Sequence, residues 1–382
     1  MLGLYGMPLP KLYFTGFETV FGEIAPRLVA AGHDVTIYCR GSHYPKELRV
    51  SEYKGVKMKY VPSPGGKSFN AIIATWFASL HALIFGKYDL FFFVNVGMGH
   101  HAAVCRIFGA KVVMNVDGLE WERGKWGFFG RTYFKTAARS AVRFCNRLIT
   151  DAEGMRQVYL ERFHKDTTMI AYGAYVQSST QPELIGKFGV EPGSYYLAVG
   201  RLVPENCTDL IISGFLASGS AKRLLVVGGA NYESEFHRRL RALGTDRVTF
   251  TGHVNDQTLL KELYCNCFAY VHGHSVGGTN PALLSAMGYG TCILAHDTVF
   301  NREVLSDAGL YFSRDTQSLA SLIRKVEEDP ALVSELRLRG PKRIEAQYTW
   351  EKITGQYEDV FREVVGEDVL AEARGRQITA GL

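Results

Sequence analysis

Two successive alternations of strand-like and helix-like segments constrain the fold of this chain more than any other feature. In the first half, short β-rich runs are separated by segments with helical spacing, such as residues 19–31 and 128–146. The predicted strands of this half are Asp34–Cys39, Asp89–Val94, Lys111–Val116 and Arg147–Thr150. Because strands separated by helices pair in parallel through helical crossovers, the pattern predicts an α/β domain.

A second alternation follows a stretch rich in Gly, Ser and Pro between Tyr172 and Gly193, which we interpret as a linker. The predicted strands of this half are Tyr195–Val199, Arg223–Val227, Val248–Phe250, Phe268–Val271 and Thr291–Ala295. With 382 residues, the chain is long enough to bury two separate cores. We therefore expect two doubly wound domains, at residues 1–175 and 176–348, and a C-terminal helix and tail at 349–382 that packs back towards the N-terminal domain.

The composition excludes several classes of protein. Apolar residues make up 47% of the chain and charged residues 21%, which argues against disorder and against a fibrous repeat. The formal net charge of +5 is too small to indicate nucleic-acid binding. The seven cysteines are odd in number and lack a C-x-x-C pair, so we expect reduced, mostly buried thiols. The chain opens without a signal-peptide pattern, and a cytoplasmic location is expected.

Residues 69–85 form a strongly apolar segment that is interrupted by Asn70, Thr75, Ser79 and His81. A helix that spans a membrane needs about 20 predominantly apolar residues, so this segment is too short and too interrupted to span. We expect a buried helix of the α/β domain. An interfacial helix is the alternative.

The strongest local signal for a binding site is the segment 271–290. It combines a tight loop at Gly277 and Gly278 with a helix start, in which Thr279 or Asn280 can act as the cap and the next residue is a proline. Free N–H groups and the positive end of a helix dipole bind phosphate. The segment therefore predicts a diphosphate site, with a strand-loop-helix unit that binds no ligand as the alternative.

Two further strand ends carry glycine at the same predicted edge of the sheet. Gly200 permits close backbone approach, and Arg201 offers a permanently charged guanidinium to phosphate oxygens. Gly229 follows the next strand. In open parallel sheets ligands bind beyond the carboxyl ends of the strands, so we expect the three loops to form one anion-binding site. His272 and His274 follow the strand before Gly277 and are expected to hydrogen-bond the ligand.

Longer motifs run through both halves. In the first half they are TGFET (15–19), AGHDVTIYCR (31–40) and NVDGLEWERGKW (115–126). In the second half they are VGRLVPEN (199–206), HGHSVGGTNPALL (272–284) and HDTVFNREVLSDAGLYF (296–312). These segments are distributed between residues 15 and 312, and the resemblance that they carry spans nearly the whole chain. They resemble retaining GT-B glycosyltransferases of family 4, and within that family the bacterial β-rhamnosyltransferase-type group.

The resemblance implies an α/β GT-B architecture, in which two Rossmann-like domains face a central cleft. It implies transfer of rhamnose or another hexose, with retention of configuration and without a metal or other cofactor, in surface polysaccharide synthesis. The donor would be a nucleoside diphosphate sugar, such as a dTDP- or UDP-sugar, and the acceptor a saccharide or lipid-linked saccharide. The residues implied in catalysis are Arg201, Asp117 and His274. Those implied in donor binding are Gly200, Arg201, Asn206, Gly229, Gly277, Gly278, Thr279, Asn280 and Ser285. Those implied in acceptor binding are Gly16, Phe17, Glu18, Asp117 and Glu120.

The sequence departs from the family pattern at the donor site. Family 4 enzymes usually carry two glutamates, separated by seven residues, where this chain has Gly277 and Ser285, and a lysine where it has Asn206. The second glutamate usually accepts hydrogen bonds from the ribose hydroxyls, and such a bond is worth about 1.5–3 kcal/mol. A deoxyribose donor such as a dTDP-sugar would be less affected. A catalytically silent GT-B module, which binds a glycan or a partner enzyme, is the alternative function. A nicotinamide-dependent oxidoreductase is excluded because G-x-G-x-x-G is missing after a first strand.

One stretch of the first half carries a regular basic pattern. Between Arg123 and Leu148 there is no acidic residue, and basic residues recur at every fourth position: Arg131, Lys135, Arg139, Arg143 and Arg147. On a helix this spacing forms one face. Such a face indicates contact with an anionic membrane, and hence a peripheral location at the inner face of the plasma membrane, or with the phosphate of a lipid-linked acceptor. A solvated helix face is the alternative.

Overall fold

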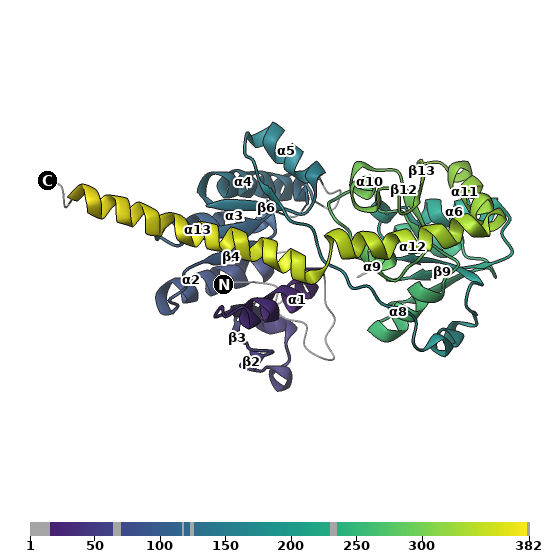
Figure 1. The fold of residues 1–382 in the computed structure, drawn as a ribbon, viewed down its shortest axis with the longest axis horizontal. Helices are drawn as coiled ribbons and strands as arrows, with labels where there is room; N and C mark the ends of the chain where they lie inside the picture. Colours follow the sequence, from purple (N-terminus) through teal and green to yellow (C-terminus); the bar gives the residue numbers. More distant parts are fainter. Residues whose placement is uncertain (1–15, 64–69, 117, 123–125, 230–234, 380–382) are drawn as a thin grey trace. The chain divides into compact units, whose positions relative to one another are not determined.

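The computed structural model describes residues 16–63, 70–116, 118–122, 126–229 and 235–379 (Figure 1). The chain divides into two compact units. The N-terminal unit comprises Met1–Ala171 with Trp350–Leu382, and the C-terminal unit comprises Tyr172–Thr349. Both units are built on parallel sheets with helical crossovers, so the expected α/β class is confirmed.

The N-terminal unit contains two sheets. The larger has the order β4-β5-β6-β7 and is parallel throughout. Its strands are β4 (Phe91–Val94), β5 (Val112–Asn115), β6 (Arg147–Thr150) and β7 (Thr168–Met169). In the smaller sheet β3 (Val56–Val61) pairs in parallel with β1 (Thr36–Arg40) and antiparallel with β2 (Glu52–Tyr53). β4 and β5 are buried along their whole length, which explains their continuous apolar sequences.

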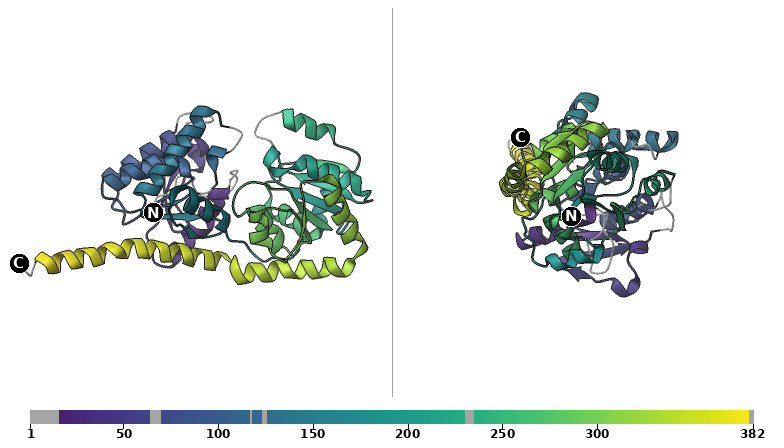
Figure 2. Two further views of the ribbon diagram at one scale, coloured as in Figure 1. Left: turned by 90° about the horizontal axis from the view of Figure 1, so that it is seen from above. Right: turned by 90° about the vertical axis from the view of Figure 1, so that its right-hand side faces the viewer.

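The helices of the N-terminal unit are α1 (Gly16–Ala30), α2 (Asn70–Phe85), α3 (Gly99–Ile107), α4 (Phe128–Phe144), α5 (Glu153–Phe163) and α13 (Trp350–Thr379). α13 returns from the far end of the chain and extends along this unit (Figures 1 and 2). The ring of Tyr357 lies 5.6 Å from that of Phe92 in β4, and its hydroxyl accepts a hydrogen bond from Asn115 Nδ2 at 2.9 Å. The first half of α13 therefore belongs to the core of the N-terminal unit.

Helix α2 is not buried on all sides. Its polar residues Asn70, Thr75 and Ser79 face inwards and are buried, whereas Phe77 and Ile84 are 46% and 68% exposed. The expectation of a buried helix is thus confirmed only for its inner face. In the described part of the chain, no helix combines the length and the apolar character needed to cross a bilayer.

The C-terminal unit has a six-stranded parallel sheet of order β10-β9-β8-β11-β12-β13, with helices on both faces (Figure 2). The strands are β8 (Tyr195–Val199), β9 (Arg223–Val227), β10 (Val248–Gly252), β11 (Ala269–His272), β12 (Ile293–His296) and β13 (Leu310–Phe312). Chain order therefore runs outwards in one direction from β8 and in the other from β11. The core packs around buried residues such as Tyr196, Phe215 and Leu294.

The helices of the C-terminal unit are α6 (Thr208–Ser218), α7 (Glu235–Ala242), α8 (Gln257–Asn266), α9 (Pro281–Gly288), α10 (Val299–Leu305), α11 (Thr316–Glu328) and α12 (Pro330–Gln347). The 3-10 helices are η1 (Gly41–His43), η2 (Lys46–Leu48), η3 (Val96–Met98), η4 (Glu120–Glu122), η5 (Pro182–Phe188) and η6 (Pro204–Asn206).

All seven cysteines are free and all except Cys265 are buried, as expected.

The stretch that we interpret as a linker is tied onto α8 by Glu262. This fully buried carboxylate accepts hydrogen bonds from the hydroxyl of Ser179 at 2.5 Å, the N–H of Thr180 at 2.8 Å and the N–H of Gln181 at 3.0 Å. Burial would raise the pKa of Glu262, but these hydrogen bonds and that from Lys261 hold it at about 2. Glu262 is therefore an ionised anchor for the beginning of the C-terminal unit.

Candidate functional site

The strand order of the C-terminal sheet reverses its direction between β8 and β11. In open α/β sheets, ligands bind beyond the carboxyl ends of the strands, at the point where the strand order reverses. Here that point is bordered by residues 200–207, which follow β8, and residues 273–280, which follow β11. The two loops are joined directly, because the N–H and the hydroxyl of Ser275 both donate to the carbonyl of Glu205, at 2.9 and 2.8 Å.

Asn206 provides a second link between these loops. Its Nδ2 donates to the carbonyl of Arg201 at 2.7 Å, and its Oδ1 lies 2.7 Å from Nδ1 of His274. A carbonyl can only accept, so the NH₂ group must face Arg201 and Oδ1 must face His274. Nδ1 of His274 is then the donor, and in the neutral ring Nε2 carries the lone pair. Asn206 therefore fixes both the orientation and the tautomer of His274.

The backbone of His274 is held from a third element. Asn301, a buried residue of α10, donates through Nδ2 to the carbonyls of His274 at 3.0 Å and His296 at 2.8 Å. This side chain ties the loop after β11 to the end of β12. Sequence reasoning did not single out Asn301, because its role depends on two carbonyls that are distant in the chain.

His272 differs from His274 in its surroundings. It ends β11, is only 3% exposed, and its Nδ1 lies 3.0 Å from the hydroxyl of Tyr270. Burial, and after it the neighbouring His274 and His296, hold the pKa of His272 well below its usual value. His272 is therefore a neutral residue at the end of β11. Its buried Nε2 makes no hydrogen bond within the described residues, and its contact with a ligand stays a prediction.

The loop after β9 approaches the loop after β8 without room for a side chain. The N–H of Gly200 donates to the carbonyl of Val227 at 3.0 Å, and that of Leu202 to the carbonyl of Gly229 at 3.2 Å. Gly228 has a φ of +140°, and a Cβ at this position would lie 1.9 Å from the carbonyl oxygen of Gly200. The structure thus brings the predicted glycine loops together at one edge of the sheet.

The start of α9 is capped by its own side chain. Asn280 Oδ1 accepts from the N–H of Ala282 at 2.9 Å, and Pro281 occupies the first helical position, as predicted. The N–H of Ala282 is therefore not free for a phosphate. Within the described ranges no hydrogen bond is made by the N–H groups of Gly277 and Gly278, so these two donors are available to a ligand.

The predicted donor-site residues have distinct settings. Gly277 has a φ of +118°, which side chains rarely adopt, and a Cβ there would lie 3.4 Å from Nε2 of His274. Arg201 is exposed, and among the residues that the structure describes its guanidinium has no ion pair or hydrogen bond. Thr279 is buried, and Ser285 lies half-buried in the second turn of α9.

The predicted acceptor residues lie in the N-terminal unit. Gly16 and Phe17 begin α1, and Glu18, in its first turn, is buried with Nη2 of Arg40 at 3.6 Å. Glu120 lies buried in η4 and accepts a hydrogen bond from Trp126 Nε1 at 3.2 Å. Asp117 lies outside the described residues. Both described carboxylates are therefore held by the protein.

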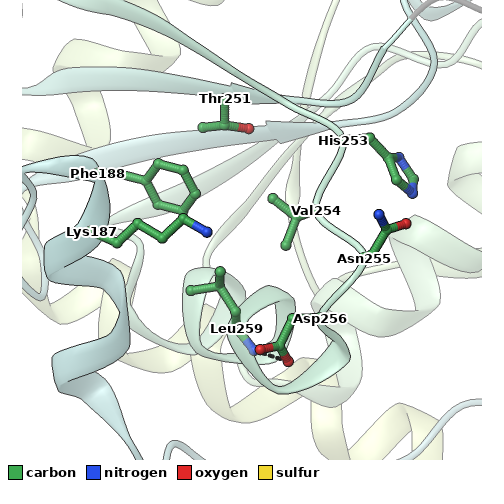
Figure 3. A pocket seen from close by; sticks show the side chains of 8 residues that line it. All are labelled: Lys187, Phe188, Thr251, His253, Val254, Asn255, Asp256 and Leu259. Carbon is green, nitrogen blue, oxygen red and sulfur yellow. Dashed lines mark hydrogen bonds between the residues drawn. The ribbon is translucent and has the colours of Figure 1, made fainter. Parts of the chain in front are cut away.

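A pocket of about 300 Å³ lies beside the edge strand β10 and contains none of the predicted site residues (Figure 3). It is lined by Lys187, Phe188, Thr251, His253, Val254, Asn255, Asp256 and Leu259. The loop beside it is tied to the loop after β9, because the N–H of Gly228 donates to the carbonyl of Gly252 at 2.9 Å. Sequence reasoning missed this pocket because its lining comes from η5 and the loop after β10, which share no motif.

Over the described ranges, no three His, Cys, Asp or Glu side chains form a group that could hold a metal ion.

Two family models match the chain, one in each half. The model described as "Glycosyl transferases group 1" matches residues 181–343, which include the loops after β8 and β11. The model of a domain of unknown function, DUF1972, matches residues 9–175.

Relatives of known structure show the fold of the whole chain. Sucrose-phosphate synthase of Thermosynechococcus elongatus has a TM-score of 0.80 at 18% identity, over 96% of this chain and 99% of that chain. Alr3699/HepE of Anabaena, solved in complex with UDP-glucose, has a TM-score of 0.75 at 16% identity, over 95% and 99%. The two units of this chain thus have the GT-B fold of two Rossmann-like domains, which confirms the expected fold class.

A curated relative matches part of the chain. Mannosylfructose-phosphate synthase of Agrobacterium fabrum is 26% identical over 196 residues, which cover 47% of this chain and 43% of that protein. The chain thus spans less than half the length of this relative.

Proposed function

We propose that this protein is a glycosyltransferase that moves a sugar from a nucleoside diphosphate sugar to a saccharide acceptor. The observation that carries the proposal is the pairing of the loops after β8 and β11, in which Asn206 bonds the carbonyl of Arg201 and Nδ1 of His274, each at 2.7 Å. Both loops lie in the segment that matches the group 1 model, and a neighbour with the same fold was solved with UDP-glucose.

The donor diphosphate would bind at the outward-facing side of the two loops. The exposed guanidinium of Arg201 neutralises the departing diphosphate, and the N–H groups of Gly277 and Gly278 add hydrogen bonds. His274 is held by Asn206 to hydrogen-bond the donor sugar. The remaining donor-side residues are Gly200, Gly229, Thr279, Asn280 and Ser285, and the proposed acceptor-side residues are Gly16, Phe17, Glu18, Asp117 and Glu120.

The finer chemistry follows from the resemblance to family 4. The sugar would be rhamnose or another hexose, transferred with retention of configuration and without a metal ion. A front-face reaction needs a stabilised leaving group and an oriented acceptor hydroxyl, both of which electrostatics and positioning can supply. Because Ser285 is short and uncharged, a dTDP-sugar is as good a candidate for the donor as a UDP-sugar.

The acceptor would be a saccharide or lipid-linked saccharide in surface polysaccharide synthesis at the inner face of the plasma membrane. Four basic residues of the predicted stripe, Arg131, Lys135, Arg139 and Arg143, are exposed on α4. The fifth, Arg147, lies in β6 and pairs with Glu363, so it does not belong to the helix face. The four-residue face on α4 supports peripheral contact with anionic lipid.

The backbone of Gly277 supports a second candidate, a catalytically silent module that binds a glycan or a partner enzyme. A φ of +118° at the position of a usual family glutamate means that the loop is built for glycine. Incubation of the protein with a panel of nucleoside diphosphate sugars and saccharide acceptors, analysed by mass spectrometry, distinguishes the candidates. The enzyme gives transfer or donor hydrolysis with at least one donor, and the silent module gives neither.

A further inference from the structure

Helix α2 presents an apolar face to the outside of the N-terminal unit. Ile73, Phe77, Leu80 and Ile84, at helical spacing, and Phe85 are 36%, 46%, 46%, 68% and 72% exposed. No charged residue occurs between Asn70 and Phe85. Helices at the surface of soluble domains normally have the opposite arrangement, with polar residues outwards and apolar residues inwards.

The inward direction of the polar side is fixed by contacts with α3 and the segment before it. Thr75 Oγ1 donates to Met98 Sδ at 3.1 Å, and Nε2 of the buried His101 lies 3.0 Å from the carbonyl of Ile72. The rings of Trp76 and His101 lie 4.3 Å apart. Rotation of α2 to hide its apolar face would break these contacts, so its orientation is specified by the neighbouring helix.

Further exposed apolar residues lie at the ends of the neighbouring helices. α3 contacts both α2 and α4. Phe108 follows the last residue of α3 and is 73% exposed, and Phe128 and Phe129, at the start of α4, are 77% and 87% exposed. Large apolar side chains exposed along one helix face, as on α2, mark an interaction site.

Basic residues predominate around this surface. α2, α3 and α4 contain no Asp or Glu, whereas Arg106 is exposed near the end of α3 and α4 carries four exposed basic residues. Just after α2, Lys87 and Asp89 are both exposed, and Lys59 lies 5.9 Å from the ring of Tyr38, whose hydroxyl bonds His81 of α2 at 2.8 Å. The apolar face of α2 thus has more cations than anions around it.

We propose that the outer face of α2 is a membrane-binding surface that inserts between the headgroups of an anionic bilayer. An apolar helix face with a basic border matches both the acyl boundary and the negative surface of such a membrane. A second copy of this chain is a poorer match, because a two-fold contact through α2 would place the basic border against itself.

This inference deepens the membrane contact of the proposed function by adding a helix beyond α4. It does not rest on catalysis, because the side chains involved lie outside the proposed donor and acceptor residues. The experiment measures binding to membranes, and sugar transfer to a soluble acceptor is measured separately. Loss of membrane binding with transfer retained, or the reverse, therefore distinguishes the two proposals.

The experiment is co-sedimentation of the full chain with phosphatidylcholine vesicles, with and without phosphatidylglycerol. The wild type should bind the anionic vesicles. Phe77→Ser, Leu80→Ser and Ile84→Ser combined should lower the partition coefficient by at least about tenfold, because binding scales with the buried apolar area. The matched control combines Val299→Ser and Leu338→Ser, two residues that are 63% and 64% exposed in the C-terminal unit, and should bind like the wild type.

Two further measurements test separately the contribution of the basic residues and the depth at which α2 inserts. Lys87→Glu with Arg106→Glu should lower binding to the anionic vesicles by at least about fivefold per residue, with little change for phosphatidylcholine alone. Brominated lipids should quench the added fluorescence of Ile84→Trp and not that of Leu338→Trp. The depth measurement requires no loss of apolar residues, so it tests the proposal even if the triple variant fails to fold.

Three results would overturn the proposal. The first is wild-type protein that stays in the supernatant with anionic vesicles. The second is a folded triple variant that binds as well as the wild type. The third is a wild-type dimer that the triple variant dissociates, which would show that the face of α2 contacts a second copy of the chain.

Discussion

Oδ1 of Asn206 lies 2.7 Å from Nδ1 of His274, and the same amide donates to the carbonyl of Arg201 at 2.7 Å. One side chain thus orients the backbone of the loop after β8 and an imidazole of the loop after β11. Family 4 glycosyltransferases, which the sequence resembles, usually have a lysine at this position. This chain has an asparagine instead, and both ends of its amide are hydrogen-bonded. We infer that the site uses Asn206 to position other groups.

Replacing Asn206 by Leu should release the tautomer of His274 and weaken donor binding. The loss of two hydrogen bonds of ordinary strength corresponds to about 1–3 kcal/mol, or a roughly 5- to 150-fold rise in the dissociation constant. Ring ¹⁵N NMR of the wild type should show protonated Nδ1, and the variant should show a mixture of tautomers. Gln317→Ala, at an exposed position of α11, is the control and should leave both measurements unchanged. Protonated Nε2 in the neutral wild-type ring would contradict the assignment.

Restoring a carboxylate at Ser285 should increase affinity for ribonucleotides. Ser285 is half-buried in α9, where a Glu fits the helical backbone. A carboxylate that accepts from ribose hydroxyls adds about 1.5–3 kcal/mol, so Ser285→Glu should tighten UDP binding by roughly 10-fold or more. The gain should be smaller for dTDP, which lacks one hydroxyl.

Gly277→Glu is the contrasting variant. Its φ of +118° is strained for any residue with a Cβ, so this change should lower the free energy of unfolding by about 1–3 kcal/mol without improving nucleotide binding.

For Ser285→Glu, equal gains in affinity for UDP and dTDP would contradict the prediction. They would show that the new carboxylate does not act through the ribose hydroxyls.

Glu262 should make the C-terminal unit sensitive to acid. Its pKa is about 2 in the folded chain, despite burial, because of the hydrogen bonds from Ser179, Thr180 and Gln181. The unfolded carboxyl titrates near 4.3, so the contribution to stability is present above that pH and is lost as pH falls towards 2. The difference corresponds to about 3 kcal/mol.

Glu262→Gln should therefore lower the free energy of unfolding at pH 7 by about 3 kcal/mol and flatten its decline in acid. Chemical denaturation at several pH values measures both effects. Glu235→Gln, at an exposed position in the first turn of α7, is the control. Unchanged stability in Glu262→Gln would mean that the carboxylate does not anchor the segment.

His101 should destabilise the N-terminal unit as pH falls below 7. Burial lowers the pKa of His101 to about 4, although the hydrogen bond to the carbonyl of Ile72 opposes this shift. The unfolded chain, with a histidine pKa near 6.5, binds more protons in the interval between these values, so the free energy of unfolding falls by about 2 kcal/mol from pH 7 to 5. His101→Phe should remove this part of the slope, and His164→Asn, at an exposed position, should retain it. A slope that persists in His101→Phe would contradict this assignment.

Elements that form because of their own local sequence were predicted more accurately than elements that depend on contacts with distant residues. Tyr195–Val199, Arg223–Val227 and Arg147–Thr150 were predicted to the residue, because each is a short apolar run with a clear boundary. β2, β7 and β13 were not predicted, because strands of two or three residues have no periodicity and form only through their neighbours. β3, with six residues, was missed as well.

The candidate site shows the same limit. Glycine loops at strand ends identify the edge of the sheet, and Asn280 and Pro281 are recognisable as a helix start. The bond between Asn206 and His274 joins residues 68 positions apart, and no local pattern encodes it. The exposure of the outer face of α2 could not be predicted either, because the sequence of an apolar helix does not show which of its sides packs against the protein.

The central claim is that the loops after β8 and β11 bind a nucleoside diphosphate, and isothermal titration calorimetry with UDP, dTDP and GDP tests it most directly. At least one nucleotide should bind with 1:1 stoichiometry, and Arg201→Ala should weaken it by roughly 10- to 150-fold, the value of a charge-assisted hydrogen bond. Arg239→Ala, an exposed arginine of α7, should bind like the wild type. No heat of binding with any of the three nucleotides, or equal affinity in Arg201→Ala, would contradict the account.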